Sequence, residues 1–209
     1  MIKRFFVITG ILAFVSGFIF GEESIRNPQI TKGIEYHNLS RADSGKNASA
    51  NIEKALITLE PFVSSDAIAC AYYGSALTIK AGIISEKNPI KSLSYLEEGS
   101  SYLDKAVNLK PDDIELRMIR LENGIEVSRS SPVKRYGVIK EDVDFLLLEK
   151  NMCQLSSKDQ AEAYLYCGYY FQDAGDLETA LDLFDLAVET NGECEAGLTA
   201  QKMLDKYSE

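Results

Sequence analysis

Residues 161–188 of this chain, AEAYLYCGYYFQDAGDLETALDLFDLAV, decide its fold. Apolar residues recur at intervals of three and four on both sides of Gly175-Asp176, which is the period of an amphipathic helix. Glycine commonly follows the end of a helix, and aspartate commonly caps the start of the next one. The stretch therefore predicts two helices joined by a tight turn.

The same stretch resembles a tetratricopeptide repeat. Six of its residues occupy the spacings W-x2-L-G-x2-Y and A-x3-F of that family, namely Tyr164, Cys167, Gly168, Phe171, Ala180 and Phe184. The resemblance implies that helix pairs stack into a surface for another molecule, and that the repeat itself supplies no chemistry. It also implies that Gly168 and Ala180 are small because the two helices cross closely there.

A second, degenerate copy of the pattern covers residues 66–111. Tyr73-Gly74-x2-Leu77 resembles the first half of the repeat, and Gly99-x3-Leu103-x2-Ala106-x4-Pro111 resembles the second half. However, Gly74 and Gly99 are 25 positions apart, whereas Gly168 and Ala180 are 12 apart. We therefore expect about 13 extra residues there, taken up by longer helices.

The rest of the chain predicts further helices and no strand. A weak helical pattern occupies 30–42 within a lead-in that we place at 22–47, and 48–209 forms the helical domain. In that domain the clearest repeat is 161–190, and a closing helix covers 194–207. The expected helices of the domain are 48–59, 67–84, 89–110, 114–127, 140–149, 157–174, 177–190 and 194–207. We expect 128–137 to be the longest irregular segment. The fold class is therefore all-α, and the resemblance implies antiparallel helix pairs stacked as a short right-handed superhelix (an α-solenoid).

The N-terminus has the order of a secretory signal peptide. Met1-Ile-Lys-Arg is basic, 5–20 is uncharged and mostly apolar, and the acidic Glu22 follows Gly21. We therefore predict export to a periplasm or the exterior after removal of residues 1–21. The alternative is an uncleaved anchor made by residues 5–20, because Ile19 is a poor residue three places before the cleavage point.

The chain is acidic, with 32 Asp and Glu against 22 Lys and Arg, a formal charge of −10. No Lys or Arg occurs between Lys158 and Lys202. Such a surface repels phosphate backbones and anionic lipid headgroups, which argues against nucleic acid as a partner. Two interpretations of the acidity stay open, simple solubility and a cationic partner.

The four cysteines are even in number, as in proteins of oxidising compartments. Cys70 and Cys167 lie on apolar helical faces, where a thiol acts as a small hydrophobe. If a disulfide forms, we expect Cys153 to pair with Cys194, since both lie in or near connections. No C-x2-C pair is present, so we expect no structural zinc site.

The resemblance also implies which residues face a groove. In the clear repeat these are Tyr169, Gln172 and Asp173. In the unit after Pro111 the corresponding positions are Glu122, Ile125 and Glu126. Such a groove suits a peptide carrying amide or basic groups, and the alternative is ordinary solvated helix surface.

Arg117 and Arg120 fall on positions that pack against the partner helix in the clear repeat. Two guanidinium groups cannot be buried without acids. Three alternatives follow. The register slips and both face solvent, or they pair with acids such as Glu115, Asp142 and Asp144, or they bind an anion together with Lys134 and Arg135.

The sequence lacks the residues of a recognisable enzyme. It has a single histidine, His37, and no phosphate-binding loop, no G-x-S-x-G and no histidine pair at metal spacing. Residues 70–120 also resemble exported bacterial repeat proteins of unassigned activity. We therefore expect a non-enzymatic scaffold in the bacterial cell envelope, without cofactor or metal, that binds another protein or peptide. The alternative is a periplasmic transporter-associated protein that docks a solute-binding component or carries a small ligand.

Overall fold

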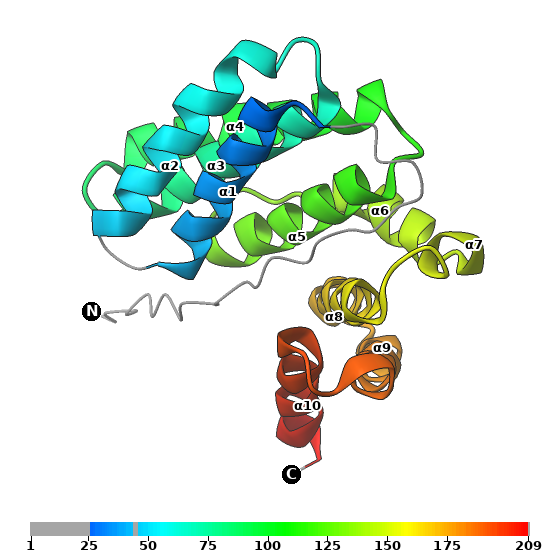
Figure 1. Ribbon diagram of the computed structural model, residues 1–209. Helices are drawn as coiled ribbons and strands as arrows, with labels where there is room; N and C mark the ends of the chain where they lie inside the picture. Colours follow the sequence, from blue (N-terminus) through cyan, green and yellow to red (C-terminus); the bar gives the residue numbers. More distant parts are fainter. Residues whose placement is uncertain (1–25, 44–45, 209) are drawn as a thin grey trace, which may run out of the picture.

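The computed structural model describes residues 26–43 and 46–208, and within them the chain is helical throughout, without a strand (Figure 1). The elements are α1 (Pro28–Ala42), α2 (Lys46–Leu59), the short 3-10 helix η1 (Glu60–Phe62), α3 (Ala67–Ile84), α4 (Pro89–Leu109), α5 (Ile114–Ser130), α6 (Tyr136–Leu146), α7 (Glu149–Met152), α8 (Ser157–Ala174), α9 (Leu177–Asn191) and α10 (Glu195–Tyr207). The predicted all-α class is confirmed. The predicted signal peptide lies outside the described residues.

Short polar side chains start the helices. Asp66, Asp113 and Asp176 each accept a hydrogen bond from the backbone N–H three residues later, at 2.8, 3.2 and 3.2 Å. These bonds satisfy N–H groups that have no partner within the helix. Gly175 ends α8 in the left-handed conformation with φ of 88°, which favours glycine. The turn predicted at Gly175-Asp176 is therefore confirmed.

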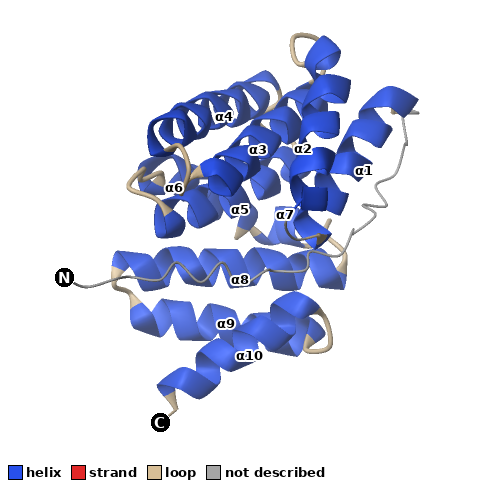
Figure 2. Ribbon diagram, turned by 90° about the vertical axis from the view of Figure 1, so that its left-hand side faces the viewer, coloured by secondary structure: helices blue, strands red, loops and turns tan. Residues whose placement is uncertain are grey.

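Successive helices form antiparallel pairs that pack in chain order. α1 packs on α2, α3 on α4, α5 on α6 and α8 on α9, while the first helices α3, α5 and α8 also contact one another in sequence. Figure 2 shows α3 beside α4 and α8 beside α9. However, α8 and α9 are seen end-on in Figure 1, where α5 is seen from the side, so the last pair crosses α5 at a steep angle.

α3 forms the centre of the N-terminal half. By length and composition it is the one helix of the described residues apolar enough to cross a membrane, but 61% of it is buried within the protein. It contacts α1, α2, α4 and α5, so its apolar surface is covered on several sides. Its closest crossing, with α4, is at Gly74 and Gly99. A Cβ added to Gly74 would lie 2.6 Å from the carbonyl oxygen of Gly99.

The corresponding crossing of α8 and α9 is at Gly168 and Ala180. A Cβ on Gly168 would lie 3.3 Å from the carbonyl oxygen of Ala180 and 2.6 Å from the ring of Phe184. Ala180 and Phe184 are fully buried. The predicted close crossing at these small residues is confirmed.

The helix expected from the weak pattern at 30–42 is present as α1, and it is a regular part of the helical fold. α1 packs on α2 and α3, and its Ile30 and Ile34 belong to the same apolar cluster as Leu59. The pattern was weak because the remaining buried residues of α1 are Gly33, His37 and Ser40. A helix whose buried side includes polar residues shows little apolar periodicity.

The irregular segment predicted at 128–137 is shorter than expected. α5 continues to Ser130 and α6 begins at Tyr136, so residues 131–135 connect them. The Ser131 and Ser130 hydroxyls each donate to a backbone carbonyl four residues earlier, at 2.7 and 2.6 Å. The helix therefore continues through these serines, whose hydroxyls bond to carbonyls of its last turn, where composition alone suggested a loop.

The expected disulfide is absent: all four cysteines are free thiols. Cys194 caps α10, where its Sγ accepts from the Gly197 N–H at 3.4 Å, while Cys153 is exposed after α7. Cys70 and Cys167 are fully buried, and burial raises the pKa of both thiols. These two cysteines behave as the small apolar residues that the sequence indicated.

We predict that Gly168→Leu lowers the free energy of unfolding by about 1–3 kcal/mol, because the new side chain overlaps the Phe184 ring. Gly82→Leu is the matched control, since a Cβ there meets no atom within 4 Å. Thermal melting measures both variants. Equal melting temperatures for Gly168→Leu and the parent protein would contradict the close crossing.

Candidate functional site

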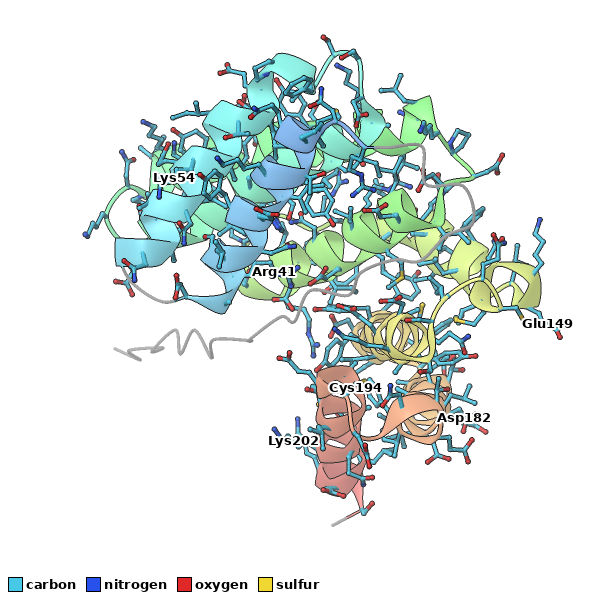
Figure 3. The ribbon with its side chains drawn as sticks, in the orientation of Figure 1. Arg41, Lys54, Glu149, Asp182, Cys194 and Lys202 are labelled. Atoms are coloured by element: carbon cyan, nitrogen blue, oxygen red, sulfur yellow. The ribbon has the colours of Figure 1, made fainter. Side chains whose placement is uncertain are left out.

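Four helices meet around the ion pair of Arg41 and Glu122. Arg41 at the end of α1 donates to Glu122 Oε1 in the middle of α5, and the Tyr166 hydroxyl of α8 donates to the same oxygen at 3.3 Å. The side chains of Arg41 and Glu122 are 24% and 16% exposed. Figure 3 shows Arg41 at the lower end of α1, above Cys194 at the start of α10. The pair is therefore mostly shielded from water.

More carboxylates than guanidinium groups lie at this junction. Burial works against the charge of Glu122, but Arg41 outweighs it and lowers the Glu122 pKa. Burial raises the pKa of Glu162 to about 8, and the Glu122 carboxylate adds to this shift. Burial, again with Glu122, also raises the pKa of Glu126. Two carboxyl groups beside the ion pair are thus held toward their protonated form.

His37, one turn before Arg41, ties α1 to α3. Its Nε2 and the Ser75 Oγ are hydrogen-bonded at 2.9 Å, and its ring stands edge-on to Tyr72 at 5.1 Å between centroids. Burial, with the nearby Arg41 charge, lowers the pKa of His37 to about 4. The ring is therefore neutral at physiological pH and acts as a buried hydrogen-bonding group.

A small cavity of about 50 Å³ opens beside the ion pair, between the end of α1, α8 and α10. Its wall consists of Arg41, Lys158, Glu162, Leu165, Tyr166, Tyr169, Cys194, Glu195, Ala196 and Thr199. We call the surface made by Arg41, Glu122, Glu162, Tyr166, Tyr169 and Glu195 the first-helix face. All of these residues except Glu195 of α10 lie on α1, α5 or α8, and each of these three helices begins a helix pair. Carboxylates, a guanidinium and phenol rings meet here, and all of these groups form hydrogen bonds.

A second group of contacts extends this face along α8. The Arg129 guanidinium of α5 lies 4.1 Å from the centre of the Tyr169 ring and pairs with Asp173 at 3.4 Å. Arg129 also donates to Gln172 Oε1 at 2.8 Å, and Gln172 donates to the Tyr207 hydroxyl of α10 at 3.0 Å. α5, α8 and α10 are therefore linked by one row of polar contacts.

The structure places the predicted groove residues as follows. Glu122, Tyr169, Gln172 and Asp173 lie on the adjoining surfaces of α5 and α8 that carry the contacts above. Ile125 does not face a groove: it is fully buried in the apolar core with Leu121 and Ile139. Its prediction is wrong because α5 packs on both α6 and α8, and these contacts cover that side of the helix.

Arg117 and Arg120 lie apart from this face, in a network with α6. Arg120 donates to both oxygens of the fully buried Asp142 at 2.8 Å, and Arg117 donates to Asp142 Oδ1 at 3.0 Å. Of the three alternatives considered for Arg117 and Arg120, the structure therefore shows the second, in which both arginines pair with an acid. The other acids considered have different partners, Glu115 with Arg26 and Asp144 with Lys140.

Sequence reasoning missed Arg41 and Glu162, which complete the first-helix face. Arg41 lies in a segment that was assigned to a lead-in, and its partner Glu122 is 81 positions away. Glu162 follows the repeat pattern as an ordinary helix-surface acid. One feature of the sequence pointed toward this site. Asp and Glu residues recur after Lys158 without any Lys or Arg before Lys202, which is consistent with several carboxylates near Arg41.

No family model matches the chain, and no curated protein matches it. Among the described residues, no group of three or more His, Cys, Asp or Glu side chains is arranged to hold a metal ion. The resemblance to tetratricopeptide repeats therefore stays a prediction, and the functional argument depends on the first-helix face itself.

We predict that Arg41→Met lowers the free energy of unfolding by about 3 kcal/mol, because it leaves the Glu122 carboxylate buried without its cation. The double variant Arg41→Met/Glu122→Gln should recover part of this loss, since it removes the charge as well. Urea unfolding of the parent, both single variants and the double variant measures the coupling. Additive losses would contradict the pairing.

We predict that Glu162→Gln removes a loss of stability that develops as the pH rises from 4.5 to about 8. The pKa of Glu162 rises from 4.5 to about 8 on folding, so the unfolded chain releases this proton first and stability falls as pH rises between these values. His37, with a folded pKa of about 4, acts with the opposite sign between pH 4 and 6.5. Urea midpoints between pH 6.5 and 8 therefore isolate Glu162. Parallel pH profiles of parent and variant would contradict the assignment.

Proposed function

We propose that this chain is a non-enzymatic scaffold that binds a segment of another protein on the first-helix face. The observation that carries the proposal is the cavity between Arg41, α8 and α10, where carboxylates and tyrosine rings border an opening. Aromatic and charged side chains around a recess are typical of protein-binding sites.

We further propose that the helix pairs form an irregular solenoid related to tetratricopeptide repeats. The packing of each pair on the next, and of first helices α3, α5 and α8 on one another, supports this arrangement. The close crossings at Gly74 with Gly99 and at Gly168 with Ala180 support it too. The steep angle between α5 and α8 is the main departure from a regular stack.

The partner segment should carry basic or amide groups. Glu162 and Glu195 border the cavity, and burial raises the pKa of both. A cationic side chain placed between them would favour their ionised form and gain attraction that water does not screen. Tyr166 and Tyr169 also line the cavity, and Arg129 already lies over the Tyr169 ring, so this ring can accept a cationic group. The predicted export places this partner in the cell envelope.

Site-specific photocrosslinking in intact cells tests this proposal. A photoreactive residue at Thr199, on the cavity wall, should capture one discrete protein, whereas the same residue at Asp182 of α9 should not (Figure 3). The exposed Asp182 provides the matched control position. Equal labelling from both positions would contradict a specific face. A small molecule that copurifies in place of a protein would favour the ligand-carrying alternative.

A further inference from the structure

A second, larger recess lies on a different part of the molecule, between α4 and the connection 131–135. This groove has a volume of about 670 Å³, within the range of small-molecule sites. Its wall consists of Glu97, Ser100, Ser101, Asp104, Lys105, Asn108, Leu109, Val133, Lys134 and Arg135. The spacing of the α4 residues, at three and four positions, places them on one face of that helix. We call this recess the α4 groove.

The connection that forms the other wall is held by several bonds. The ammonium of Lys134 donates to the carbonyl oxygens of Ser128 and Ser131 at the end of α5. The backbone N–H of Arg135 donates to Ser128 Oγ at 2.8 Å, and its guanidinium forms a bidentate pair with Asp104. These bonds hold Lys134 and Arg135 beside α4 before any ligand binds. The entropy lost by ordering these two side chains on binding is therefore small.

Ser100 is the buried member of this wall. It is 5% exposed, and its Oγ is one of two buried side-chain atoms of the described residues that have no hydrogen-bond partner. A buried hydroxyl without a partner is destabilising, and native structures seldom retain one without a reason. A ligand in the α4 groove would supply the missing partner.

The charge of the groove is opposite in sign to that of the chain. Its wall carries three cations, Lys105, Lys134 and Arg135, and two acids, Glu97 and Asp104, a difference of +1 against −10 for the whole chain. Arg135 donates to both carboxylate oxygens of Asp104. The Arg120 guanidinium also donates to Asp104 Oδ1, at 3.4 Å. Lys105 donates to the Val63 carbonyl at 3.2 Å, which uses one of its three N–H donors.

We propose that the α4 groove binds a small oxyanion, a carboxylate or a phosphate, between Lys105, Lys134 and Ser100. Lys105 keeps two N–H donors and Lys134 keeps one for charge-assisted hydrogen bonds to the anion. Ser100 is part of the same wall, and its buried hydroxyl would donate to the anion as well. Ser101 and Asn108 add polar groups along the same helix face. Glu97 is exposed and lies about two turns before Lys105 in α4. The site is independent of the first-helix face.

Calorimetric titration of the full chain with citrate, and separately with inorganic phosphate, tests the site at low ionic strength. We expect saturable binding of one of the two anions, with a Kd at or below about 1 mM. Stronger binding of citrate assigns a carboxylate ligand, and stronger binding of phosphate assigns a phosphate ligand. Lys105→Met should weaken the binding about 10-fold, since it removes a charged donor. Lys150→Met, an exposed site on α7, is the matched control and should leave it unchanged.

Ser100→Ala separates a ligand site from a structural role. It removes the unpartnered hydroxyl, so the melting temperature without anion should stay equal or rise, while anion binding weakens. A melting temperature that falls, with anion binding unchanged, would assign Ser100 to packing and overturn the proposal. It is equally overturned if neither anion binds saturably, or if both bind Lys105→Met as well as the parent protein.

Discussion

The ion pair of Arg41 and Glu122 is the interaction on which the arrangement of the first-helix face depends. It joins the end of α1 to the middle of α5, and Tyr166 adds α8 to the same carboxylate oxygen. A guanidinium and a carboxylate removed from water are stable only when each satisfies the other. The neighbouring Glu162 would add a second negative charge, and its pKa of about 8 keeps it largely protonated at neutral pH. At neutral pH the Arg41–Glu122 pair is therefore not opposed by a second full negative charge from Glu162.

α5 carries two such polar networks on different sides. Glu122 and Arg129 face α1 and α8, whereas Arg117 and Arg120 face α6 and bind Asp142. Apolar residues on this helix therefore alternate with buried or half-buried charged residues. Each network specifies one neighbour, because an arginine left without its acid would be costly. An apolar surface would accept several packings of similar energy, so the charges help to define how α5 lies against α1, α6 and α8.

The sequence predicted the helix pairs well wherever packing is apolar and local. The close crossing of α8 and α9 followed from the spacing of Gly168, Ala180 and Phe184, and that of α3 and α4 from Gly74 and Gly99. α1 was underestimated because His37 and Ser40 are on its buried side. The partners of Arg41 and Arg120 are 81 and 22 positions away, so no local pattern reveals them. The sequence therefore did not predict which polar side chains of different helices pair with one another. The exception is Asp142, which was among the acids considered as partners of Arg120.

The steep crossing of α8 over α5 bears on what the first-helix face can bind. In a regular stack the first helices line one continuous groove, long enough for an extended peptide. Here the Arg41 side chain, at the end of α1, reaches the recess between α8 and α10 and forms part of its wall. The recess that is left, about 50 Å³, accommodates the tip of one side chain rather than a peptide backbone. Recognition on this face should therefore depend on a single projecting basic or amide group, with the surrounding helix surfaces supplying most of the contact area.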